Sequence, residues 1–133
     1  MKLGQCVPML GVSDIERTLA FYCGTLGAKV ANAMEHDGKT GWACLDTGSG
    51  EVMFMNEGPS CINETGRAAR HEIILYFKPD DVAKLHASLR ACGARCSDLR
   101  VTFYGMKEFD MEDPDGYQIW FGQETDEPAT VRE

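Results

Sequence analysis

The 133-residue sequence predicts an α+β fold made of two tandem βαβββ units. Each half of the chain carries one helical apolar pattern that begins near an aspartate and ends at a glycine, followed by short segments separated by turns. Landmarks of the two halves recur 66 residues apart (for example 93 − 27). They are the pairs Asp14 and Asp80, Leu19 and Leu85, Gly27 and Gly93, Ala28 and Ala94, and Gly50 and Gly116. Five agreements in order indicate an internal duplication.

The first unit, residues 1–56, opens with a strand over residues 3–12, which Pro8 marks as an edge or bulged strand. Asp14 is the expected N-cap of a helix, and Gly27 ends that helix as its C′ residue. Three strands are expected next, over residues 29–35, 41–46 and 51–56, with turns at 36–39 and 47–50.

The second unit, residues 71–123, follows a linker over residues 57–70 that is rich in Gly, Ser, Asn and Thr. A strand is expected over residues 72–77. Asp80 or Asp81 caps the second helix, Gly93 ends it, and residues 94–103 hold a strand and a loop. Residues 124–133 are expected to form an acidic, disordered tail.

A β-hairpin over residues 103–123 completes the second unit. Its turn is Asp113-Pro114-Asp115-Gly116, in which proline fixes φ, aspartate caps its own backbone and glycine accepts a positive φ. In both flanking runs, even-numbered residues share one face and odd-numbered residues share the other.

Composition narrows the class of protein. The formal net charge of −8 argues against nucleic acid as a partner, because nucleic-acid binding needs a basic surface. The longest apolar runs are only a few residues, so we expect neither a membrane span nor a signal peptide, and a cytoplasmic location. The six cysteines are then expected as reduced thiols rather than as disulfides.

Two motifs of the first unit, Pro8-x-Leu10-x-Val12-x-Asp14 and Phe21-Tyr22-x3-Leu26-Gly27, together with the two βαβββ units, resemble the vicinal-oxygen-chelate superfamily. That group includes glyoxalase I, extradiol dioxygenases and bleomycin-resistance proteins. Tyr104-Gly105-Met106-Lys107-Glu108-Phe109, the Asp113–Gly116 turn and Phe121-Gly122-Gln123 are similar to the bleomycin-resistance branch. The resemblance implies a curved, partly open eight-stranded sheet, a homodimer, and a ligand held on the concave faces.

The resemblance also implies where a metal would bind in the enzymes of this superfamily. The corresponding positions here are Val7, Phe54, Ile73 and Trp120, and none of these side chains offers a lone pair suited to a hard or borderline cation. A one-residue error in register would bring Glu72 or the apolar Ile74 inward instead, and a two-residue error would bring His71 inward. We therefore expect no metal and no other cofactor.

Catalytic residues are not indicated by the sequence. His36 lies in a turn and His86 on the second helix, both expected in solvent, and neither forms a recognisable nucleophile–base pair. Glu108 is the carboxylate with the best claim to a functional role; the alternative is a structural role in ordering its strand.

Four aromatic residues are the candidate ligand-binding residues: Trp42, Phe54, Tyr104 and Trp120. Each either lines an apolar groove or fills the core between sheet and helix, and the sequence leaves both open. The resulting hypothesis is a metal-free protein that sequesters an amphipathic or cationic small molecule. The alternative is a metal-dependent lyase, isomerase or dioxygenase of the same superfamily.

Overall fold

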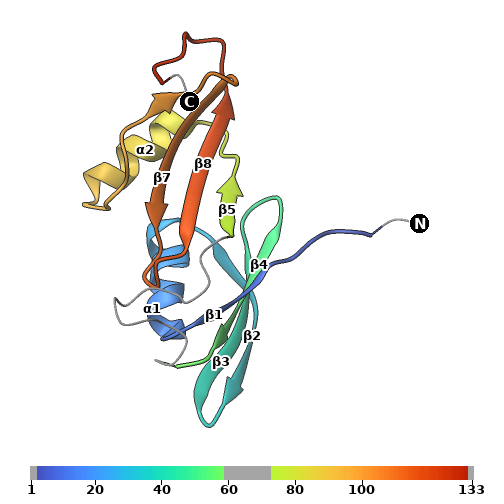
Figure 1. Cartoon of the computed structure of the whole chain (residues 1–133). Coiled ribbons are helices and arrows are strands. Elements are labelled where there is room, and N and C mark those ends of the chain that lie inside the picture. Colours follow the sequence, from blue (N-terminus) through green and yellow to red (C-terminus); the bar gives the residue numbers. More distant parts are fainter. Residues whose placement is uncertain (1–2, 59–72, 132–133) are drawn as a thin grey trace. The chain divides into compact units, whose positions relative to one another are not determined.

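The computed structural model describes residues 3–58 and 73–131 and divides the chain into two units, Met1–Ala69 and Arg70–Glu133. Each unit contains a four-stranded sheet and one helical segment (Figure 1). The order of elements in each unit is βαβββ, so the predicted α+β fold and the tandem repeat are confirmed. The eight predicted strands lie four in each sheet.

In unit 1, β1 (Met9–Val12) lies parallel to β4 (Glu51–Asn56). β4 pairs antiparallel with β3 (Lys39–Asp46), and β3 pairs with β2 (Lys29–His36). β1 is shorter than the predicted strand over residues 3–12. It begins just after Pro8, which has no amide hydrogen to donate to a strand ladder.

The helical segment of unit 1 is capped as predicted. The Asp14 side chain accepts hydrogen bonds from the amides of Glu16 and Arg17, at 3.2 and 3.4 Å. α1 (Ile15–Leu19) continues into a π-helix, η1 (Ala20–Thr25), and Gly27, with φ of 82°, ends the segment.

In unit 2, β5 (Ile74–Phe77) lies parallel to β8 (Gln118–Glu124), and β8 pairs antiparallel with β7 (Met106–Glu112). The short strand β6 (Arg100–Val101) forms the other edge, against β7. α2 (Val82–Ala91) is capped by Asp81, whose side chain accepts from the Lys84 amide at 3.0 Å.

The hairpin between β7 and β8 has the predicted turn. Asp113 Oδ1 accepts hydrogen bonds from the amides of Asp115 and Tyr117, at 2.8 and 2.9 Å, and Gly116 has a φ of 85°. On one face of the two strands Phe109, Met111, Ile119 and Phe121 are buried, and the even-numbered residues lie on the opposite face, as expected.

The helices show that the repeat has two offsets rather than one. The N-caps are Asp14 and Asp81, which are 67 residues apart (81 − 14), so Asp80 is not the counterpart of Asp14. The glycines that end the helices, Gly27 and Gly93, are 66 apart, and both have a positive φ. The first helical segment thus holds one residue more than the second, and the wider turn of η1 accommodates it.

The first and last strands of each unit follow the offset of 67 as well. Asn56 and Gln123 make equivalent hydrogen bonds to the amides of Ile15 and Val82, and Phe54 and Phe121, two residues earlier, are both buried, so Phe54 corresponds to Phe121 (121 − 54). The counterpart of Trp120 is therefore Met53, not Phe54. A one-residue shift in a strand exchanges its two faces, which is why this correction changes the candidate site.

The last turn of each unit explains why the offset between the units changes from 66 back to 67 residues. In unit 1 the Thr47 amide donates to the Gly50 carbonyl, whereas in unit 2 the Asp113 amide donates to the Tyr117 carbonyl. The second turn is one residue longer. Gly116 therefore does not correspond to Gly50, contrary to the prediction.

Each helix start is also held by a side-chain amide from the last strand of its unit. Asn56 Oδ1 accepts from the Ile15 amide at 3.0 Å, and Gln123 Oε1 accepts from the Val82 amide at 2.8 Å. Gln123 Nε2 donates to the Asp80 carbonyl at 2.8 Å. These contacts satisfy backbone groups that a helix end leaves without a partner.

Part of the predicted tail is ordered, which corrects the sequence expectation. The Thr130 amide donates to the Val101 carbonyl at 2.8 Å, and the Val101 amide donates to Thr130 Oγ1 at 2.8 Å. Lys107 and Glu127 form an ion pair at 2.8 Å. β6 is a two-residue edge strand with backbone groups left unpaired, and the tail pairs with them.

His86 was expected in solvent, and this expectation is wrong. Its ring packs edge-on against Phe109 with centroids 4.8 Å apart, and Nε2 lies 2.8 Å from the Ser97 carbonyl oxygen. His36 is exposed, as expected.

The five cysteines in the described ranges are free thiols; Cys61 lies outside them. None of the helices in those ranges is long and apolar enough to cross a membrane.

Candidate functional site

One face of the unit 2 sheet carries a connected network of polar side chains. Phe109, Ile119 and Phe121 are buried on the side of α2, where His86 packs on Phe109. The alternate residues of β7 and β8 therefore point away from α2. We call this second surface the open face.

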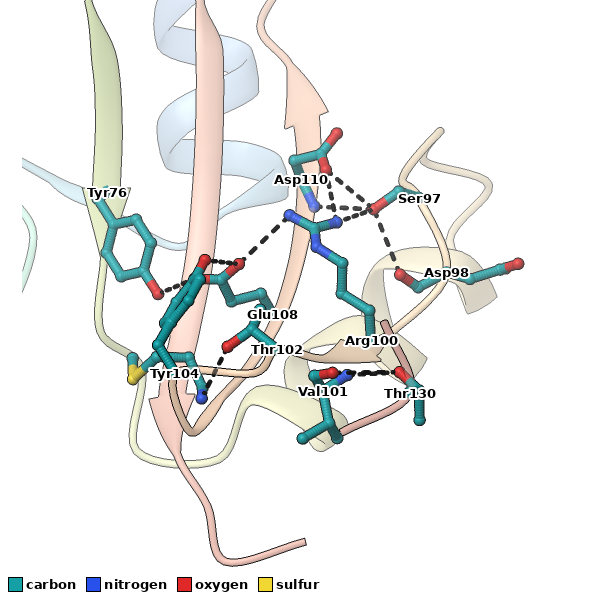
Figure 2. Close-up of polar contacts among 11 residues, drawn as sticks. Tyr76, Ser97, Asp98, Arg100, Val101, Thr102, Tyr104, Glu108, Asp110 and Thr130 are labelled. Atoms are coloured by element: carbon teal, nitrogen blue, oxygen red, sulfur yellow. Dashed lines mark hydrogen bonds and ion pairs between the residues drawn. The ribbon is translucent and has the colours of Figure 1, made fainter. Parts of the chain in front are cut away.

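Glu108 is the centre of the open face and is only 1 % exposed. One carboxylate oxygen, Oε2, accepts from the Tyr76 hydroxyl at 2.6 Å, and the Tyr104 hydroxyl lies 3.0 and 3.1 Å from the two oxygens. Arg100 Nη2 lies 3.5 Å from Oε1. Figure 2 shows these donors converging on one carboxylate. A buried charge needs such partners to offset its loss of hydration.

Gly122 makes the contact between Tyr76 and Glu108 possible. Tyr76 is on β5 and Glu108 is on β7, with β8 between them, and Gly122 is the residue of β8 that pairs with Glu108. A Cβ at this position would overlap the Tyr76 hydroxyl. The missing side chain thus opens a path across the central strand.

Arg100 joins the network from β6. Its Nη1 lies 2.8 Å from Asp110 Oδ2 and 3.4 Å from Ser97 Oγ, and Ser97 Oγ also accepts from the Asp110 amide at 2.9 Å. The guanidinium carbon lies 5.0 Å from the centroid of the Trp120 ring, within the range of a cation–π contact. The guanidinium is therefore held by two carboxylates, as Figure 2 shows, and by the face of the Trp120 ring.

The tyrosine hydroxyls respond to this environment. Burial, followed by the hydrogen bond to Glu108, raises the pKa of the Tyr76 hydroxyl well above its ordinary value. The same causes raise the pKa of Tyr104. Both hydroxyls are thus held as O–H donors, and neither is prepared to act as a base.

Two clefts flank the Glu108 network. One, of about 630 Å³, is lined by Asp110, Glu112 and Gln118 from the strands and by residues 95–97 from the segment after α2. The other, of about 430 Å³, is lined by Tyr104, Met106 and residues 124–126. Each is within the range of volumes of small-molecule sites.

Trp120 carries an unsatisfied polar atom. Its indole Nε1–H is buried and has no hydrogen-bond partner among the residues that the structure describes. A buried donor without a partner costs roughly 1–3 kcal/mol. Buried donors of this kind call for an explanation, and the usual ones are strain, a catalytic role, or an ordered water or ion.

A metal site is not supported by the side chains present. With the corrected offset, the positions that correspond to the metal ligands of related enzymes hold Val7, Met53, Ile74 and Trp120. One thioether among apolar groups does not suit a hard or borderline cation. Within residues 3–58 and 73–131, no three His, Cys, Asp or Glu side chains are grouped to hold a metal. The alternative ligands His71 and Glu72 lie outside the described residues.

The predicted aromatic residues fall in different places. Trp120 and Tyr104 are both part of the network on the open face, around Glu108. Phe54 is fully buried and packs on Tyr22 with centroids 4.7 Å apart, so it takes the core alternative. Phe54 lies on the opposite face of β4 from the one expected, because the offset between the two units is 67 residues at this strand rather than 66.

Trp42 belongs to the corresponding face of unit 1. In the register of that sheet it pairs with Met34 and Met55, and the next row pairs Met53 with Met9. Met9, Met34 and Met55 are exposed. The two faces are chemically different, since unit 1 presents thioethers where unit 2 presents hydroxyl, carboxylate and guanidinium groups.

Three residues of the site were missed by the sequence reasoning: Tyr76, Arg100 and Gly122. Tyr76 could have been found from its strand parity, because β5 alternates Ile74 and Tyr76 on one face. Arg100 could not, because nothing in the sequence fixes the register of a two-residue strand.

Comparison with protein families places the chain in a known group. Residues 2–121 match the family model described as the Glyoxalase/Bleomycin resistance protein/Dioxygenase superfamily. The protein belongs to this superfamily, as its two βαβββ units indicate. A comparison with curated protein sequences found no significant match.

Solved structures of similar fold include proteins from several bacteria. TioX from Micromonospora sp. ML1 is 22% identical with a TM-score of 0.73, over 91% of this chain and 98% of that one. SMU.1112c is 26% identical with a TM-score of 0.74, over 91% and 99%. TnmS3 from Streptomyces sp. CB03234, described as an antibiotic binding protein, is 20% identical with a TM-score of 0.68, over 94% and 100%. At these identities TioX and TnmS3 establish the fold alone.

Proposed function

We propose that the protein binds an amphipathic or cationic small molecule on the open face of unit 2 and sequesters it without chemical change. The observation that carries the proposal is a pair of exposed tyrosine rings with fixed hydroxyls. Tyr76 and Tyr104 are 40% and 53% exposed, yet both hydroxyls are bonded to the buried Glu108. Rings held in this way offer apolar area to a ligand at little cost in side-chain entropy.

The charges of the open face favour a ligand with cationic character. Glu108, Asp110 and Glu112 contribute three carboxylates from β7, and Arg100 contributes one positive charge from β6. A positively charged group on the ligand would be attracted, and the tyrosine rings would contact its apolar part. The name of TnmS3 as an antibiotic binding protein agrees with a ligand of this general kind.

Trp120 and Tyr104 remain in the proposed ligand-binding set, because both belong to the open face of unit 2. Trp42 lies on the sheet of unit 1 and is no part of this proposed site, and Phe54 is enclosed in the core. No metal or cofactor forms part of the proposal. We further expect a homodimer, which sedimentation velocity would test.

Two measurements test the proposal. Native mass spectrometry of the purified protein should detect a co-purified small molecule, and calorimetry with bleomycin as the first probe should give a saturable signal. Tyr104→Ala should weaken binding at least tenfold. Phe103→Ala is the matched control, since Phe103 is 65% exposed beside Tyr104 but forms no bond with Glu108.

Elemental analysis addresses the alternative function. A stoichiometric transition metal in the purified protein, together with turnover of a glyoxalase or dioxygenase substrate, would replace the proposal with an enzyme. Absence of any co-purified molecule and of any heat with a panel of cationic and amphipathic compounds would also refute it.

A further inference from the structure

The surroundings of Arg100 form a complete binding site for a cation. Asp110 Oδ2 lies 2.8 Å from one guanidinium nitrogen and Glu108 Oε1 lies 3.5 Å from the other. The Trp120 ring lies under the guanidinium carbon at 5.0 Å. Two carboxylates and an aromatic face are the groups that recognise guanidinium and substituted ammonium ions in proteins.

This site is built into the sheet rather than formed by mobile surface groups. Glu108 is buried and is held by two tyrosine hydroxyls. Asp110 is fixed at its backbone by Ser97 Oγ. Arg100 is the exception, because it reaches the site from the short edge strand β6.

The charge balance shows which ligand the site prefers. With Arg100 in place, one positive charge faces two carboxylates, and Glu112 adds a third carboxylate to the same face of β7. Without Arg100, Glu108 and Asp110 lose the ion-pair partner that the structure shows for them, although Arg95 lines the cleft beside Asp110. A cation would replace the guanidinium with the same contacts, and an anion would be repelled.

Arg100 is carried by β6, a two-residue strand at the edge of the sheet. Its two residues pair with Glu108 and Lys107 of β7, and on the other side Val101 is held by Thr130. Edge strands of this length contribute few of the interactions that hold a sheet together. Moving Arg100 outward breaks its ion pairs and leaves the buried Glu108 with the two tyrosine hydroxyls as its described partners, a cost that an incoming cation would offset.

We infer that Trp120, Glu108 and Asp110 recognise a guanidinium or substituted-ammonium group of the ligand, and that Arg100 occupies this position until the ligand displaces it. The inference rests on the proposed function and assigns the chemical class of the ligand. Occupancy by Arg100 lowers the apparent affinity for any other cation, because a ligand binds only the fraction of molecules in which the site is open.

Chemical rescue tests this inference without knowledge of the natural ligand. In a Trp42→Phe background Trp120 is the remaining tryptophan, so its fluorescence reports on the site. Methylguanidinium and tetramethylammonium are titrated to about 50 mM against Arg100→Ala and against Arg100→Gln, which keeps much of the side-chain length. We expect saturable binding to both variants, at least tenfold tighter than to the Trp42→Phe parent.

Controls separate recognition from general effects of salt. Sodium chloride at equal ionic strength and sodium acetate should give no saturable change. Arg90→Ala is the matched variant, because Arg90 pairs with Asp98 at 2.7 Å on the surface and has no aromatic ring in its described contacts. It should show no rescue. Adding Asp110→Asn to Arg100→Gln should weaken methylguanidinium binding about fivefold or more.

Titrations of Arg100→Ala and Arg100→Gln that match the parent would overturn the inference, as would acetate binding that requires Arg100. If Arg100→Ala does not fold, Arg100→Gln decides the question. Rescue by methylguanidinium with no natural small molecule found would uphold the cation site while refuting the proposed function. A natural ligand that binds the parent and both Arg100 variants equally would support the proposed function and refute the cation site.

Discussion

Replacing Gly122 with alanine tests the geometry of the open face most directly. At this strand position an alanine normally stabilises a protein, by about 0.4–1 kcal/mol, because it reduces the freedom of the unfolded chain. Here the added Cβ would overlap the hydroxyl of Tyr76 and come within 3.0 Å of its ring. Tyr76 would have to move and would lose its 2.6 Å hydrogen bond to Glu108.

A hydrogen bond to a charged group contributes about 1.5–3 kcal/mol. We therefore expect Gly122→Ala to lower the free energy of unfolding by about 2 kcal/mol. For an m value of about 2 kcal/mol per molar urea, the midpoint would fall by about 1 M. Urea titration followed by tryptophan fluorescence measures this shift, with Trp120 on the strand concerned.

The double-mutant cycle with Tyr76→Ala isolates the cause. In that background the hydroxyl is gone, so Gly122→Ala should change stability by less than about 0.5 kcal/mol. Gly50→Ala is the control, since a Cβ there meets only ordinary contacts at 3.7 Å. An equal loss of stability with and without Tyr76 would refute the path across β8.

Three further predictions follow from the same contacts. Gln123→Ala should destabilise the protein by about 1–2 kcal/mol and Asn56→Ala by about 1 kcal/mol in urea titrations, because each removes a helix-start hydrogen bond and Gln123 makes a second. The pKa of Tyr76 is raised in the folded state. The contribution of Tyr76 to the free energy of unfolding should therefore be fully present below about pH 10 and should decline above it, as the tyrosine of the unfolded chain ionises. Tyr76→Phe should flatten this decline in urea titrations at about pH 9 to 11. Thr130→Val should speed amide hydrogen exchange at Val101 at least tenfold while leaving the core of unit 2 protected, and unchanged exchange would show that the tail does not hold β6.

The duplication and the hairpin were predictable because local chemistry determines them. Asp113, Pro114 and Gly116 fix the turn through their own backbone preferences, and Gly27 fixes the helix end by accepting a positive φ. These features need no knowledge of distant partners. The alternation beside the turn then placed Trp120 on the correct face.

The offset between the units was predictable only to within one residue. An error of one residue was enough to assign the wrong residue of β4 to the face that corresponds to Trp120. Sequence identity at Gly50 and Gly116 supported a constant spacing, but π-helical geometry in η1 and a longer final turn each change the count. Neither the π-helical turn nor the longer final turn is indicated by a recognisable pattern in the sequence. The result was that Phe54, rather than Met53, was assigned to the face of Trp120.

The contacts of Glu108 lay beyond sequence reasoning for a different reason, although strand parity alone would have placed Tyr76 on the same face of its strand as Ile74. Tyr76 lies 32 residues away in the chain and reaches its carboxylate only across a glycine on a third strand. Arg100 comes from a strand of two residues, too short to carry a periodic pattern. Such contacts depend on tertiary register, which a single sequence does not state.

The burial of Glu108 argues that this network exists for function. A carboxylate that is 1 % exposed is more costly than an apolar residue of similar volume, even when it is paired. Leucine or methionine at position 108 would suit a sheet of this kind better on stability alone. Glutamate instead positions Tyr76, Tyr104 and Arg100 from three separate segments of unit 2. Local rules of stability are broken most often at functional sites, and under the function proposed above the requirement would be a surface whose rings and charges are in place before a ligand binds.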